Sequence, residues 1–222
     1  MDSKILKEEK MFFLLGAIFI TLLVISNIIA SKVIIIGGLI GPAAVLCYAL
    51  TFAISDTIAE IWGKERTKFI VVLGLICCII SAIFIKIAIK MPAAEFWNNQ
   101  KEYKLILGSN MRIVLASMIS YLISQHHDIW AFHYLKKLTK GRHLWLRNNL
   151  STMISQLIDT SIFIIIAFFN TGSPIFSLII GQYIIKLIIA IIDTPIVYVL
   201  VNVIRGLLYK NTTSNTYNMV SS

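Results

Sequence analysis

Long runs of apolar residues constrain the fold of this chain more than any other feature. A bilayer core requires about 20 consecutive apolar residues per helix, whereas a water-soluble core does not require runs of that length. The 222 residues are 58% hydrophobic and 14% charged, against about 45–50% and about 25% in an ordinary soluble domain. We predict an all-α membrane protein with six transmembrane helices, at Met11–Ser31, Pro42–Trp62, Phe69–Ile89, Arg112–Leu135, Leu150–Phe169 and Ile175–Ile204.

The apolar runs predict one membrane domain, residues 11–208, between two polar ends. We expect residues 1–10 to form a cytoplasmic N-terminal segment. Residues 209–222, rich in Asn, Thr and Ser, are expected to form a disordered cytoplasmic tail. The first run is too long, and lacks the small-residue cleavage pattern, for a removable signal peptide. The sequence has no Gly-x-x-x-x-Gly-Lys-Ser/Thr pattern, so it supplies no P-loop ATPase of its own.

Basic residues concentrate in every second loop and predict the orientation in the membrane. The net charge of +9 would suit a protein that binds nucleic acid. The alternation of more and less basic loops, with Lys136–Arg147 on the more basic side, is instead typical of a membrane protein. The positive-inside rule places both termini in the cytoplasm, and we expect no nucleic-acid partner. Basic residues are also fairly numerous in and beside the connection Pro92–Asn110, namely Lys90, Lys101, Lys104 and Arg112, which weakens this assignment. The connection Pro92–Asn110 is interpreted as an interfacial helix anchored by Trp97 and Tyr103, with a lid over a pocket as the alternative.

Ionisable residues inside the apolar segments indicate a function. A charge near the bilayer centre costs roughly 2.5–3.5 kcal/mol on insertion scales, and such residues usually face the bundle interior or a polar path. We therefore predict a transporter whose site is built from these residues. They are Asp56, Glu60, Asp128, Asp159, Lys186 and Asp193.

Helical spacing groups these charges with other polar side chains, because residues three or four apart share a helix face. The groups are Asp56 with Glu60, Gln125 with Asp128, Asn149 with Gln156 and Asp159, and Gln182 with Lys186. Asn27 lies near the end of the first predicted helix. Simpler roles stay open: helix packing for Ser and Thr stripes, solvation or a salt bridge beside Lys64 for Glu60, and a structural ion pair with an aspartate for Lys186.

The histidines, the cysteines and a glycine-rich connection receive structural interpretations. His126, His127 and His133 suggest a metal site or a proton relay, but an interfacial role is favoured, and we expect no metal or cofactor. Val33–Gly41 is interpreted as a turn between helices, with a loop that lines the site as the alternative. Three cysteines inside apolar spans are expected to be buried thiols: Cys47, Cys77 and Cys78.

Carboxylates, amides and a cation together suit a flat ligand rich in hydrogen-bonding groups. A carboxylate accepts from two adjacent N–H groups, an amide both donates and accepts, and Lys donates to a carbonyl. Aromatic side chains such as Trp62, Trp130, Phe132 and Tyr183 could stack on its ring. This chemistry permits a purine-like base but does not select it over an amino acid or an ion.

Several segments resemble the queuosine-precursor transporter family, also called the VUT group. They are Ser26–Lys32, Leu50–Gly63, Arg112–Ser117, His143–Thr152, Gln156–Thr160, Tyr183–Lys186 and Asp193–Pro195. The resemblance covers nearly the whole chain apart from its ends. The adjacent His126 and His127 depart from the apolar residues that the family commonly has there, which could shift ligand preference.

The resemblance implies a six-helix fold similar to the substrate-binding subunits of energy-coupling-factor vitamin transporters. It implies import, across the inner or plasma membrane, of 7-deazaguanines: the cyano and aminomethyl precursors of queuosine, or queuine. The family's polar motif residues, carried over as substrate-binding candidates, are Asn27, Asp56, Glu60, Gln125, Asp128, Asn149, Gln156, Asp159, Lys186 and Asp193.

Other functions stay open beside this one. The chain could be the substrate-binding subunit for another vitamin or purine-like solute, working with a separate ATPase module. A membrane enzyme lacks support, because no nucleophile–base motif is present. A purely structural protein would leave Asp128 and Asp159 unexplained.

Overall fold

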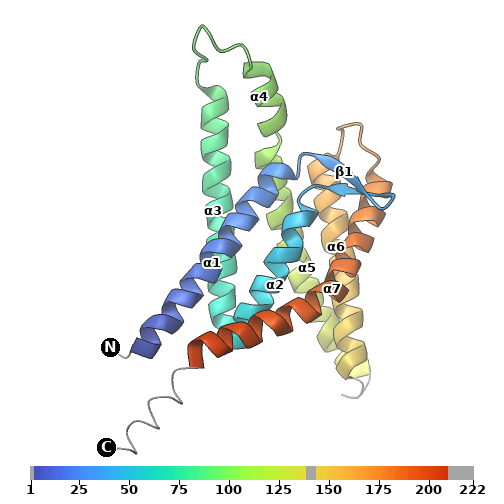
Figure 1. The fold of residues 1–222 in the computed structure, drawn as a ribbon. Helices are drawn as coiled ribbons and strands as arrows, with labels where there is room; N and C mark the ends of the chain where they lie inside the picture. The colour runs from blue at the N-terminus through green and yellow to red at the C-terminus, as the bar shows by residue number, and fades with distance from the viewer. Residues whose placement is uncertain (1–2, 139–143, 210–222) are drawn as a thin grey trace, which may run out of the picture. The chain divides into compact units, whose positions relative to one another are not determined.

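The computed structural model describes residues 3–138 and 144–209, and these are helical almost throughout (Figure 1). Hydrophobic runs of this length are expected to form helices in a bilayer, because a helix satisfies its own backbone hydrogen bonds. The helices are α1 (Ser3–Ile29), α2 (Val45–Trp62), α3 (Lys64–Lys90), α4 (Gln100–Leu107), α5 (Asn110–Leu138), α6 (Leu144–Phe168) and α7 (Ile175–Tyr209).

The helices are consistent with the predicted class, a multi-pass helical membrane protein. Two apolar segments, Met153–Phe168 of α6 and Pro195–Leu208 of α7, are shorter than a full span within the described residues. The count of six spans and the side of the termini therefore stay predictions. Five described segments are long and apolar enough to cross a membrane: Ile5–Ile29, Val45–Trp62, Lys64–Lys90, Gln100–Ser124 and Ile175–Ile192.

The connection between α1 and α2 contains an element that the sequence analysis did not foresee. It forms an antiparallel hairpin of β1 (Val33–Ile36) and β2 (Leu39–Pro42). Gly37 and Gly38 make the two-residue turn, with φ angles of 56° and 83°, the left-handed values that a type I′ hairpin turn requires. The expected turn is present, but it is flanked by strands.

The described chain divides into two compact units. Unit 1 contains α1 up to Ser26, the chain from Leu46 to Cys77, and α7 from Ile188 onward. Unit 2 contains Asn27–Val45, with the hairpin, and Cys78–Leu187, with the end of α3, α4, α5, α6 and the start of α7.

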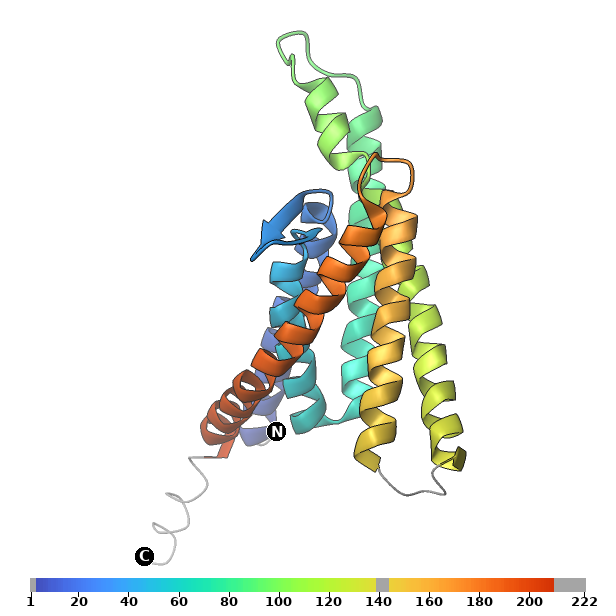
Figure 2. The same cartoon turned by 90° about the vertical axis from the view of Figure 1, so that its right-hand side faces the viewer.

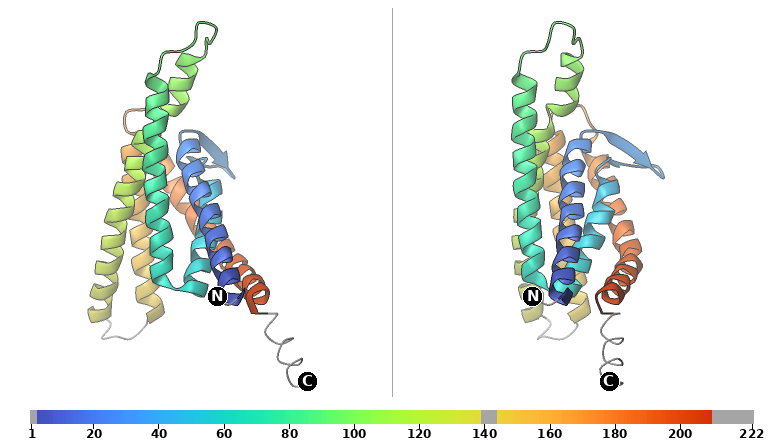
Figure 3. Two further views of the ribbon diagram at one scale, coloured as in Figure 1. Left: turned by 90° about the vertical axis from the view of Figure 1, so that its left-hand side faces the viewer. Right: turned by 60° about the vertical axis from the view of Figure 1, so that its left-hand side comes forward.

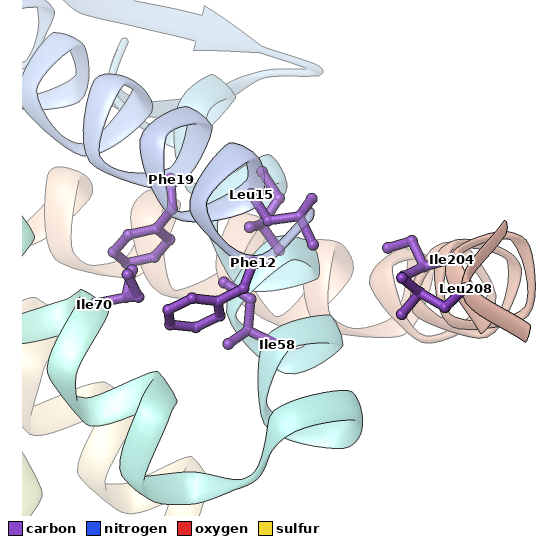
Figure 4. Close-up of a cluster of buried hydrophobic side chains, with 8 residues drawn as sticks. Phe12, Leu15, Phe19, Ile58, Ile70, Ile204 and Leu208 are labelled. Atoms are coloured by element: carbon purple, nitrogen blue, oxygen red, sulfur yellow. The ribbon is translucent and has the colours of Figure 1, made fainter. Parts of the chain in front are cut away.

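The core of unit 1 is an apolar cluster in which α1 meets α2 and α3 (Figure 4). Its buried members are Phe12, Leu15, Phe19, Ile54, Ile58, Ile70, Ile204 and Leu208. Glycines let α1 and α3 approach closely. A Cβ added at Gly16 would lie 2.7 Å from Ile70 Cδ1, and one added at Gly74 would lie 2.8 Å from Leu23 Cδ2. Small residues at such contacts are a common device of membrane helices.

In unit 2, α5 and α6 pack side by side along their lengths (Figures 1 and 2). Arg112 near the start of α5 joins them, since its guanidinium donates to the backbone carbonyls of Ile166 and Phe169. Carbonyls at a helix C-terminus have no hydrogen-bond partner within the helix, so this arginine supplies donors to the free carbonyls at the end of α6. The hairpin packs on α7, where a Cβ added at Gly181 would collide with the carbonyl oxygen of Ile40.

Candidate functional site

A charged pair between α6 and α7 is the centre of the candidate site. Lys186 Nζ lies 2.8 Å from Asp159 Oδ2, and the side chains of the two residues are 6% and 27% exposed, respectively. Both residues belong to unit 2. Removing such charges from water costs several kcal/mol per ion, and the attraction between them repays that only with good geometry. A pair of this kind is therefore weak evidence for stability and fits a functional role.

Next to the pair, Gln182 presents an unused hydrogen-bond acceptor. It precedes Lys186 by four residues on α7, so the two side chains share a face of that helix. Gln182 is 1% exposed, and its Oε1 atom has no hydrogen-bond partner among the described residues. Leaving a buried acceptor unsatisfied costs about 1–3 kcal/mol, so the position is suited to a donor group on a ligand.

The α6 residues around Asp159 extend this polar region. Gln156 is half-buried and lies three residues before Asp159, on the same face. Thr160 is fully buried, and its hydroxyl also has no partner among the described residues. Neither Gln182 nor Thr160 is among the site residues predicted from the sequence, because helical spacing alone does not reveal an unsatisfied group.

The described histidines make local or interhelical hydrogen bonds. His126 Nδ1 lies 2.7 Å from the Leu122 carbonyl oxygen, one turn earlier on α5, while His127 Nδ1 lies 2.9 Å from the Ser155 hydroxyl on α6. Within residues 3–138 and 144–209, the side chains described form no group of three His, Cys, Asp or Glu that could hold a metal ion. The side chain of His133 lies outside the described part.

Asn27 is buried at the end of α1 and linked to two other helices of unit 2. Its side-chain Nδ2 lies 3.4 Å from Cys78 Sγ on α3, and its backbone carbonyl oxygen accepts a hydrogen bond from Asn110 Nδ2 at 3.2 Å. It is 3% exposed. These contacts give Asn27 a clear packing role, whether or not it also contacts a ligand.

In unit 1, Asp56 and Glu60 are both exposed on α2. Glu60 Oε1 accepts a hydrogen bond from Arg205 of α7 at 2.9 Å. The salt bridge that the sequence left open for Glu60 exists, and its partner is 145 residues away rather than in the adjacent loop. An exposed pair of this kind contributes about 0–1 kcal/mol.

Four predicted site residues have side chains outside the described part of the structure, although their helices are described. Their positions belong to α5, α6 and α7, and their place in the site stays a prediction. They are Gln125, Asp128, Asn149 and Asp193. Of the others, the structure brings Asp159 and Lys186 into contact, and Gln156 lies on the same face of α6 as Asp159.

Comparison with known proteins gives a family. Residues 42–200 match the family model described as "Putative vitamin uptake transporter". A relative from Bacillus subtilis (strain 168), named "Probable queuosine precursor transporter", is 26% identical over 178 residues, which cover 79% of this chain and 78% of the relative. A relative of the same name from Haemophilus influenzae (strain ATCC 51907 / DSM 11121 / KW20 / Rd) is 25% identical over 165 residues, 72% of this chain and 68% of the relative. No solved structure matches.

Proposed function

The chain belongs to the vitamin uptake transporter family, and from this premise we propose that it imports 7-deazaguanine precursors of queuosine across the inner or plasma membrane. The names of the two relatives support this substrate class. The apolar helices, long enough to span a bilayer, support the location.

One observation carries the proposal: the contact between Asp159 and Lys186, with Gln182 one turn away. The guanine-like edge of a 7-deazaguanine has an amino group, a ring N–H and a carbonyl. A carboxylate accepts from the two adjacent N–H groups, Lys donates to the carbonyl, and a Gln amide supplies one more acceptor or donor. Lys186 Nζ donates to Asp159 Oδ2, and a ligand would donate to the carboxylate and accept from the lysine.

The rest of the site is proposed from the candidates whose roles are open. Asp128 and Gln125 of α5 and Asn149 of α6 are proposed as substrate-binding residues from the family's polar motif. Asn27 stays a candidate in unit 2, while Asp56, Glu60 and Asp193, which belong to unit 1, are proposed as substrate-binding residues only from the family's polar motif. The bundle would have six spans with both termini in the cytoplasm, in accord with the positive-inside rule.

The family description favours a second candidate function. A "vitamin uptake transporter" could serve as the substrate-binding subunit for another vitamin or purine-like solute and depend on a separate ATPase module. The same polar groups would suit such a ligand. Identification of a bound ATPase after purification from membranes, with stimulation of uptake by ATP, would support this alternative.

Uptake by cells that cannot synthesise queuosine precursors tests the proposal. Labelled queuine, 7-cyano-7-deazaguanine and 7-aminomethyl-7-deazaguanine should enter cells that express the chain and not cells with an empty vector. Glu65→Gln is a matched control for carboxylate-to-amide changes in the site, because the Glu65 side chain is 87% exposed in its pair with Lys68. This variant should transport like the natural chain. Equal entry of all three compounds with and without the chain would contradict the proposal.

A further inference from the structure

A cavity of about 700 Å³ lies in unit 2, away from the residues of the charged pair, between the end of α3, α4 and the start of α5. Figure 3 shows α4 folding back beside the end of α3, with α5 continuing from it. Most of the cavity wall is apolar. Its aliphatic lining includes Ala82, Ile85, Ile89, Leu107, Leu115 and Ile119.

Four cations from three helices line this cavity: Lys86, Lys90, Lys104 and Arg112. None of the lining residues is acidic. The three lysines make no ion pair with any residue in the described part of the chain. Arg112 uses two N–H groups on the end of α6, out of the five that a guanidinium carries. Unpaired like charges around one cavity repel each other, so an anion would be favoured there.

The cations lie where apolar helices end. Lys90 is the last residue of the apolar segment Lys64–Lys90, and Lys104 is near the start of the segment Gln100–Ser124. Ala82 precedes Lys90 by eight residues, about 12 Å along a helix that rises 1.5 Å per residue. The cavity therefore combines a cationic end at the expected membrane boundary with an apolar wall that extends into the hydrocarbon depth.

The surface of α4 is also suited to a membrane boundary. The helix has no buried residue, and it exposes Leu105 and Ile106 at 80% and 59%. The preceding loop exposes Phe96 and places the Trp97 ring edge-on to that of Tyr103, with centroids 5.8 Å apart. Aromatic and aliphatic side chains beside lysines are typical of segments that lie among lipid headgroups.

We propose that this cavity binds an anionic phospholipid, with its phosphate among Lys86, Lys90, Lys104 and Arg112 and an acyl chain along the apolar wall. Clustered lysine and arginine side chains beside an apolar wall attract the phosphate of an anionic headgroup. A small soluble anion would leave the aliphatic wall unused, and a neutral lipid would leave the cations uncompensated. The proposal also accounts for the cations in and beside the connection Pro92–Asn110, which run against the alternation of charge: Lys90, Lys104 and Arg112 serve a ligand rather than the orientation of the chain.

The test uses the full chain, purified in detergent and stripped of lipid. Phosphatidylglycerol, added in micelles, should raise the unfolding temperature and survive as a bound adduct in native mass spectrometry, whereas phosphatidylcholine should do neither at equal concentration. The triple variant Lys86→Gln, Lys90→Gln, Lys104→Gln should bind phosphatidylglycerol roughly tenfold more weakly or worse, because each lysine near an anionic headgroup contributes to the attraction. A triple control at exposed lysines outside the cavity, Lys10→Gln, Lys32→Gln, Lys64→Gln, should keep the natural affinity.

Three results would overturn the proposal: equal effects of the two lipids on the natural chain, an unchanged preference in the cavity variant, or an equal loss in the control variant. A shift of the unfolding temperature by inorganic phosphate alone, equal to that by phosphatidylglycerol, would also overturn it. The proposal is independent of the transported solute. If the cavity variant fails to fold, Lys90→Gln and Lys104→Gln, tested singly at these exposed positions, must each weaken phosphatidylglycerol binding.

Discussion

Lys186 of α7 donates to Asp159 of α6 across 2.8 Å, and the lysine is the more deeply buried of the two. The lysine is therefore the more strongly desolvated partner, while the carboxylate retains some access to solvent or to a ligand. This asymmetry suits a site in which an incoming base contacts the carboxylate and the lysine remains in place.

Replacement of Asp159 by Asn should abolish or strongly reduce uptake and also lower stability. The amide has one acceptor oxygen where the carboxylate has two, so it cannot accept from two adjacent N–H groups in a bidentate way, and it removes the negative charge that pairs with Lys186. Breaking a buried pair costs about 3–5 kcal/mol, and the lower end is expected here because the aspartate is 27% exposed. Uptake, normalised to the amount of protein in the membrane, and the unfolding temperature in detergent measure the two effects.

The double variant Asp159→Leu, Lys186→Met separates folding from transport. Exchange of a whole buried pair for apolar residues is often neutral or stabilising by 1–4 kcal/mol, so the unfolding temperature should recover. Uptake should stay lost. Recovery of transport together with stability would show that the pair is purely structural.

Replacement of Gln182 by Leu should weaken ligand binding without weakening the fold. The two side chains are similar in size, and the natural Oε1 has no hydrogen-bond partner among the described residues. Loss of one hydrogen bond to a ligand costs about 0.5–1.5 kcal/mol, or roughly two- to tenfold in affinity. Calorimetric or fluorescence titration of the purified protein with 7-aminomethyl-7-deazaguanine checks this. Unchanged affinity would remove Gln182 from the site.

Two glycines of α7 should respond in opposite directions to replacement by alanine. Gly181→Ala places a methyl group against the Ile40 carbonyl oxygen, so the hairpin must shift and stability should fall. Gly206→Ala meets nothing within 4 Å and should stabilise the helix by about 0.5–1 kcal/mol. Thermal unfolding of both variants measures the contrast, and equal effects would contradict the close contact at residue 181.

Cysteine labelling tests the proposed orientation. In a chain whose three cysteines are replaced by alanine, Lys137→Cys near the end of α5 should resist a membrane-impermeant maleimide in intact cells. Thr171→Cys, in the loop after α6, should react, since the two exposed positions lie at opposite ends of the α5–α6 pair. The reverse pattern of labelling would place the termini outside.

The sequence identified the helices, because runs such as Phe69–Ile89 exceed what a soluble core requires. The hairpin was not predicted, although Gly37-Gly38 between apolar residues is a recognised hairpin signal, because a short glycine-rich segment between two helices also fits a simple turn. Spacing placed Lys186 and Asp159 on polar helix faces but could not pair them, since pairing depends on how α6 and α7 are rotated. The Glu60–Arg205 pair likewise depends on a contact between residues distant along the chain.

Competition for binding tests most directly the claim that the Asp159 carboxylate recognises the guanine-like edge of the ligand. It shows from which base edge the carboxylate accepts hydrogen bonds. Labelled 7-aminomethyl-7-deazaguanine, bound to the purified chain, should be displaced by guanine and other 7-deazaguanines but not by adenine. Adenine places a lone pair where guanine carries its ring N–H, and a site built for one hydrogen-bonding pattern rejects the mismatch strongly. Equal displacement by adenine and guanine would contradict the account.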